Sequence, residues 1–212
     1  MLTIVNNDKG VNMLKRSTAF LKSALLTAGF ALMASEAFCN GTITGTIVTD
    51  LEKNKEDAVV YLKGVKGVVV PQKVTIEQHH LTFIPKVTTI PVGSTVEFTN
   101  HDKIYHNVFS VSEAKKFNLD TYDPGKPKHV TFDKPGAVSL LCNVHPEMSA
   151  WVVVTENRYA AVSDKAGNFI ISDVPAGTYE ITAWSEKLKP QGITTVTVSD
   201  GNTSRADIKL GD

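Results

Sequence analysis

A thiolate, an imidazole and a thioether occur within the seven residues Cys142-Asn-Val-His-Pro-Glu-Met148. A further imidazole, His106, precedes Cys142 by 36 positions (142 − 106), although spacing alone leaves His101 open as an alternative. Two His, one Cys and a weak axial Met form the ligand set of a blue-copper electron-transfer site. Structural zinc uses Cys and His without Met, and a c-type haem needs C-x-x-C-H. The motif therefore predicts one type-1 copper ion, held by a fold that brings two distant segments together.

The residues around the motif predict strands. In Ala137-Val-Ser-Leu-Leu-Cys142 every second side chain points to one face, so Cys142 falls at the end of a core-facing strand. Residues 151–154 continue as another strand, and Ser94-Thr-Val-Glu-Phe98 alternates in the same way ahead of His106. Short alternating runs separated by Gly, Pro, Asn and Asp dominate the chain, which is typical of all-β proteins. We expect the ligands at one end of a β-sandwich.

Residues 74–154 resemble the cupredoxins. The resemblance rests on Phe83-Ile-Pro85, Val92-Gly93, Phe98-Thr-Asn100 and His106-Asn107, and on a C-x-x-H-P-x-M loop similar to that of the amicyanin and plastocyanin-like members. The combination is most similar to cupredoxin-like proteins described as methylamine utilization proteins. The resemblance implies a Greek-key β-sandwich over residues 72–157. It also implies that His106, Cys142, His145 and Met148 are the metal ligands.

Two further expectations come with this resemblance. Asn107, the residue after the first ligand, should tie the two ligand loops together by hydrogen bonds. Amicyanin-like loops have Pro before the second His, whereas this chain has Val144. The Val144 N–H is therefore free to donate to the Cys142 sulfur, which would raise the reduction potential. Val144, Pro146 and Ala150 are candidates for an apolar surface patch around His145.

The C-terminal part resembles the carboxypeptidase regulatory-like (transthyretin-like) β-sandwich. Its marks are Asp164, Gly167 and Phe169, followed by Val174-Pro-Ala-Gly-Thr-Tyr179 and an alternating strand. Residues 41–64 look like the first two strands of the same sandwich, and two strands alone are marginal in water. We predict a discontinuous domain of residues 41–64 and 159–211, with the cupredoxin inserted at an exposed loop. The rival is a sequential layout in which residues 41–73 add strands to the cupredoxin.

Residues 1–39 have the pattern of a signal peptide. Lys15 and Arg16 precede the uncharged, mostly apolar run Ser23–Ser35, which has 13 residues. A membrane-spanning helix needs about 20. Small residues in Ser35-Glu-Ala37 predict cleavage near residues 37–39. The mature protein should therefore be periplasmic or secreted, without stable membrane insertion.

The charge balance and the cysteine content limit the classes of function that this chain can have. The whole chain carries 22 basic and 22 acidic residues, so nothing favours binding to nucleic acid. Of the two cysteines, Cys39 lies at the predicted cleavage region, so the mature chain keeps Cys142 alone, or both if Cys39 survives cleavage. A lone Cys in a secreted chain is either a reactive thiol or a metal thiolate. A Cys142–His145 nucleophile and base would leave Met148 and His106 unexplained, so we do not expect an enzyme. We expect a carrier of single electrons with a protein redox partner. The alternatives are a module for copper sensing, storage or delivery, or a non-redox scaffolding protein.

Three other histidines have less specific interpretations. His79 and His80 are adjacent, and neighbours on a strand point to opposite faces, so they should not chelate a metal together. His129 alternates with Val130 and Phe132, which should face the core. His129 is therefore expected on the solvent face without a role.

Overall fold

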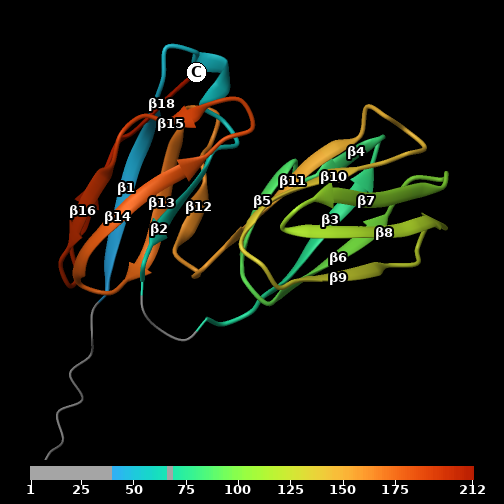
Figure 1. Ribbon diagram of the computed structural model, residues 1–212, viewed down its shortest axis with the longest axis horizontal. Helices are drawn as coiled ribbons and strands as arrows, with labels where there is room; N and C mark the ends of the chain where they lie inside the picture. The colour runs from blue at the N-terminus through green and yellow to red at the C-terminus, as the bar shows by residue number, and fades with distance from the viewer. Residues whose placement is uncertain (1–39, 66–68) are drawn as a thin grey trace, which may run out of the picture. The chain divides into compact units, whose positions relative to one another are not determined.

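The computed structural model describes residues 40–65 and 69–212, and this part of the chain is all-β, as predicted. Figure 1 traces the strands in chain order. A turn of 3₁₀ helix, η1 (Glu52–Asn54), follows the first strand. The predicted signal peptide, residues 1–39, lies outside the described residues. In the part that is described, no helix is long and apolar enough to cross a membrane.

The first sandwich comprises strands β3 to β11. Their bounds are β3 (Lys73–His79), β4 (Thr82–Ile84), β5 (Val87–Pro91), β6 (Ser94–Asn100), β7 (His106–Ser112), β8 (Lys115–Tyr122), β9 (Lys128–Phe132), β10 (Gly136–Leu141) and β11 (Ser149–Thr155). One sheet has the order β5-β11-β10-β7-β8 and the other β4-β3-β6-β9. Strand β6 is buried at every second residue, which is the alternation read from the sequence. The core of the first sandwich contains side chains from both sheets, together with Cys142 and Met148.

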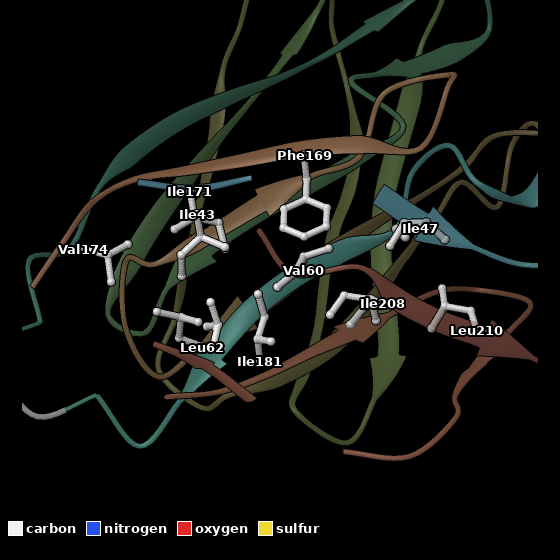
Figure 2. Packing of buried hydrophobic residues seen from close by; sticks show 14 of the residues in the cluster. Ile43, Ile47, Val60, Leu62, Phe169, Ile171, Val174, Ile181, Ile208 and Leu210 are labelled. Atoms are coloured by element: carbon white, nitrogen blue, oxygen red, sulfur yellow. The ribbon is translucent and has the colours of Figure 1, made fainter. Parts of the chain in front are cut away.

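The second sandwich comprises the remaining strands. Their bounds are β1 (Gly41–Val48), β2 (Val59–Lys63), β12 (Ala160–Val162), β13 (Asn168–Val174), β14 (Gly177–Trp184), β15 (Lys189–Pro190), β16 (Thr194–Val198), β17 (Thr203–Arg205) and β18 (Ile208–Gly211). One sheet has the order β13-β1-β18-β15, with β17 also on β1, and the other has β12-β2-β14-β16. Figure 2 shows side chains of β1, β13 and β18 packed with those of β2 and β14.

The two strands that precede the first sandwich pair with strands that follow it. Ile43 of β1 lies opposite Ile171 of β13, and Leu62 of β2 lies opposite Ile181 of β14. We propose on this ground that residues 41–64 and 159–211 form one discontinuous domain. The pairing supports the insertion over the sequential layout.

A glycine in β1 is required by close packing. A Cβ atom at Gly45 would overlap the Ala206 carbonyl oxygen and lie 2.5 Å from Cζ of Phe169. Only the absence of a side chain allows the backbone of β1 to approach this closely. The glycine at position 45 therefore permits the close packing of β1 within the second sandwich.

Candidate metal centre

Three of the four predicted ligands converge at one end of the first sandwich. His106 is the first residue of β7, Cys142 directly follows β10, and His145 lies in the loop before β11. Their potential ligand atoms all lie within 4.8 Å of one another. The two Nδ1 atoms of His106 and His145 are 3.1 Å apart. Among His, Cys, Asp and Glu side chains of residues 40–65 and 69–212, this is the one group of three that is arranged to hold a metal.

The fourth predicted ligand, Met148, lies in the same buried cluster as Cys142. Met148 is 1% exposed, Cys142 4% and His106 0%, whereas His145 is only partly buried. Two of these side chains are apolar or weakly polar, so their burial costs little. A buried imidazole such as His106 needs polar partners. Three of the four predicted ligands are therefore held inside the sandwich, and His145 is the one that reaches solvent.

Asn107 ties the ligand segments together, as the resemblance predicted. The Asn143 N–H donates to Oδ1 of Asn107 at 3.4 Å, which joins the Cys142 loop to β7. The Asn107 amide donates in turn to Oδ1 of Asn118 on β8 at 2.8 Å. The Met148 N–H donates to the His145 carbonyl at 3.0 Å and closes the turn. The expected donation from Val144 N–H to the Cys142 sulfur is not among the hydrogen bonds of the described residues.

A buried polar pair behind the ligands was not expected from the sequence. The Tyr122 hydroxyl donates to Oε1 of Gln78 at 2.7 Å, and the Gln78 amide donates to the Asn107 carbonyl at 3.3 Å. Burial raises the pKa of Tyr122, and negative charge on the neighbouring Cys142 sulfur adds to the effect. Gln78 falls on the core-facing alternation of β3 with Ile76. A Gln at such a position was the available signal for this network.

Asp102 is the second group that sequence reasoning missed. Its Oδ2 atom lies 2.8 Å from Nε2 of His106. The carboxylate also accepts the N–H groups of His80 at 2.7 Å and Leu81 at 3.1 Å. Burial alone would raise its pKa, but these backbone donors and the His106 ring lower the pKa of Asp102 to about 2. Asp102 precedes the ligand by four residues, but the segment between them is a loop rather than a helix, so the spacing gave no sequence signal of this contact.

Among the other histidines, the expected place of His129 is confirmed, whereas the expected orientation of His79 and His80 is wrong. His129 is exposed and its Nε2 lies 2.9 Å from Oε2 of Glu97, so its place on the solvent face is confirmed. His79 and His80 do not point to opposite faces, because their ring centroids are 3.8 Å apart. The strand β3 ends at His79, and His80 has a φ of 53° in the turn that follows. His101 is not part of the convergent group.

The donor set fits copper. Two imidazole nitrogens and one thiolate sulfur, with a thioether nearby, match the ligands of blue-copper sites. Metal–nitrogen bonds of about 2 Å let one ion contact two nitrogens up to about 4 Å apart. The observed separation of 3.1 Å between the two Nδ1 atoms lies within that reach.

Comparisons with known proteins give a family match for the first sandwich and several similar solved structures. Residues 70–155 match the family model of copper binding proteins of the plastocyanin/azurin family. A purple cupredoxin from Nitrosopumilus maritimus is similar over 39% of this chain and 99% of its own, with 26% identity and a TM-score of 0.35. Amicyanin from Paracoccus versutus is similar over 45% and 97%, with 23% identity and a TM-score of 0.37. A copper-containing nitrite reductase from Thermus scotoductus is similar over 53% and 28%, with 29% identity and a TM-score of 0.38. No curated protein matches the chain.

The second family match covers residues 146–211 and is the carboxypeptidase regulatory-like domain. It overlaps the first match at β11, which pairs with β10 and β5 of the first sandwich. Residues 41–64 fall outside both matches, although β1 and β2 pair with strands of the second sandwich. The chain thus combines a copper-binding domain of the plastocyanin/azurin family with a carboxypeptidase regulatory-like domain.

Proposed function

We propose that the protein is a type-1 copper protein that carries single electrons between redox partners. The observation that carries this proposal is the convergence of the ligand atoms of His106, Cys142 and His145 within 4.8 Å of one another. Met148 is buried in the same core cluster as Cys142. These four residues are the proposed ligands. A bound copper ion would supply a one-electron couple between Cu(II) and Cu(I).

The protein's own contribution is a rigid and dry set of ligands. His106 and Cys142 are each fixed at the end of a core strand, and Asn107 bridges their segments. Pro146 fixes φ directly after His145. A ligand set held in this way needs little rearrangement when the charge of the site changes. Buried ligands also favour electron exchange over substrate binding, and we therefore propose a carrier without enzymatic activity.

The partly buried His145 is the proposed route for electrons. Val144 beside it is 44% exposed, and Ile104 and Tyr105, ahead of His106, are 43% and 58% exposed. Pro146 is exposed too. The expectation that Ala150 joins this surface is wrong, because Ala150 is 1% exposed and packs in the core. A small apolar surface suits a transient redox encounter, which buries less than about 1,200 Å².

The test is the visible and EPR spectrum of the protein loaded with Cu(II). We expect an intense blue or green thiolate-to-copper band and reversible reduction with the copper retained. Retention in both oxidation states separates a carrier from a module for copper delivery or storage, which should release the ion on reduction or in the presence of an acceptor. A protein that remains colourless with Cu(II) contradicts the proposal and favours a scaffolding role.

We also propose that the protein works in the periplasm or is secreted. The basis is the signal pattern of residues 1–39. N-terminal sequencing of the exported protein should find a start near Phe38 or Asn40. An uncleaved cytoplasmic form would contradict this localisation.

A further inference from the structure

The loop between β6 and β7 places the Asp102 carboxylate against the Nε2 side of the His106 ring. Nδ1 of His106 faces Nδ1 of His145 at 3.1 Å, so Nε2 is the ring nitrogen turned away from the convergent group. That Nε2 lies 2.8 Å from Oδ2 of Asp102. A carboxylate accepts and cannot donate when ionised. The proton of the neutral His106 ring therefore belongs on Nε2, and the lone pair of Nδ1 is left for a metal.

The position of this carboxylate is itself fixed by two elements. The N–H groups of His80 and Leu81 both donate to it from the turn between β3 and β4. These two residues have positive φ values of 53° and 58°, and the turn directs both N–H groups toward one acceptor. The Asp102 N–H donates to Oδ1 of Asn100 at 3.0 Å. Asp102 is thus held before any metal binds, and its side chain is only 13% exposed.

We propose that Asp102 is a positioning residue that orients His106 and sets both the copper affinity and the reduction potential of the site. This inference rests on the proposed copper function. A carboxylate behind a ligand imidazole fixes the ring and raises its basicity. Its negative charge stabilises Cu(II), the more highly charged state, more than Cu(I). Asp102 therefore lowers the reduction potential.

The decisive variant is Asp102→Asn, which keeps the shape and a carbonyl acceptor but removes the charge. We expect the Cu(II) affinity to fall by about 10- to 100-fold, as for other partners of ligating histidines. If the variant weakens Cu(II) binding ten times more than it weakens Cu(I) binding, the reduction potential rises by about 59 mV. Competition with chelators in both oxidation states and voltammetry measure these quantities independently of any electron-transfer assay.

Glu97→Gln is the matched control. It removes a carboxylate from another imidazole, His129, at the similar distance of 2.9 Å, but on an exposed strand face of the same sandwich. This variant should leave the affinity and the potential as in the wild type. An equal shift in both variants would mean that only net charge matters, and it would overturn the assigned role.

The rival role for Asp102 is to brace the β3–β4 turn. In that case Asp102→Asn would lower the thermal stability of the metal-free protein without moving the potential or the Cu(II) affinity, and the inference would be wrong. Nitrogen NMR of the metal-free wild type gives a test that needs no variant. It should place the His106 proton on Nε2, and a proton on Nδ1 would contradict the inference. A wild-type protein that fails to bind copper would instead contradict the proposed function, and this outcome is visible before any variant is made.

Discussion

The two sandwiches are both built from alternating strands in two sheets, but their buried polar side chains have different hydrogen-bond partners. The core of the second sandwich consists of aliphatic side chains and Phe169. Its neighbourhood contains buried Asn157 and Ser163, which donate to the backbone carbonyls of Leu62 and Lys55. In the first sandwich, polar side chains also pair with one another: buried Tyr122 donates to buried Gln78, and buried His106 lies 3.1 Å from the partly buried His145.

This difference in hydrogen-bond partners indicates where side chains are positioned for a candidate metal site. Hydrogen bonds from side chains to backbone satisfy buried groups and fasten connections. Networks between buried side chains position particular atoms and are sensitive to any missing member. In the second sandwich, the described side chains of this architecture form a packed core. In the first, a strand end and a single loop convert the same architecture into a metal site.

The largest expected effect comes from the thiolate. Cys142→Ser should abolish the charge-transfer colour completely, because serine is not a thiolate ligand. The matched control, Ala183→Ser, places the same polar atom at a 3% exposed position in the core of the second sandwich and should keep the colour. Visible absorption after Cu(II) loading measures both. A Cys142→Ser protein that stays coloured would show that the assigned ligand is wrong.

Separating the sandwiches tests whether each has its own core. We expect a fragment of residues 70–157 to fold and bind copper, because β3 to β11 supply both sheets of the first sandwich. Deleting residues 41–64 from the full chain should unfold the second sandwich, which would lose β1 and β2. Circular dichroism and copper titration report the two outcomes. If the fragment folds only when residues 41–64 are added, the discontinuous domain is refuted.

A core truncation should affect stability in one sandwich only. Phe169 is 2% exposed and packs with Ile43 and Ile171 in the second core. Phe169→Ala should lower the free energy of unfolding of that sandwich by about 3–5 kcal/mol, with the copper spectrum unchanged. Denaturant titration followed by fluorescence and by the copper band separates the two transitions. A changed spectrum would show that the sandwiches are not independent.

The smallest expected effect concerns the surface near His145. Val144→Lys adds a charge at a 44% exposed position and should slow electron exchange with the native partner several-fold, since charges at an interface rim act mainly on association. The copper spectrum should barely change. Stopped-flow kinetics measure the rate, and Val111→Lys is the control, as Val111 is 67% exposed on β7. Equal rates for Val144→Lys and wild type would place the electron route elsewhere.

Much of the candidate site was predictable because its residues are close in sequence or share a periodic pattern. Cys142, His145 and Met148 lie in one loop, and the alternation of Val138 and Leu140 indicated which face Cys142 would take. The role of Asp102 was not predictable, because it depends on a turn in another hairpin that supplies two N–H donors. The burial of Ala150 was missed because loop length did not reveal where β11 begins.

The sequence by itself determined the all-β class and the chemical types of the donors, since these depend on local periodicity and on side-chain chemistry. The tertiary structure decided which donors meet. It brought His106 to within hydrogen-bond distance of His145, which lies 39 positions later. It also paired β1 with β13, although the whole first sandwich lies between these strands in the sequence. It also decided that the His106 ring is held from behind by a carboxylate. Contacts between distant segments depend on how the strands pack in three dimensions, and no pattern within a single segment specifies that packing.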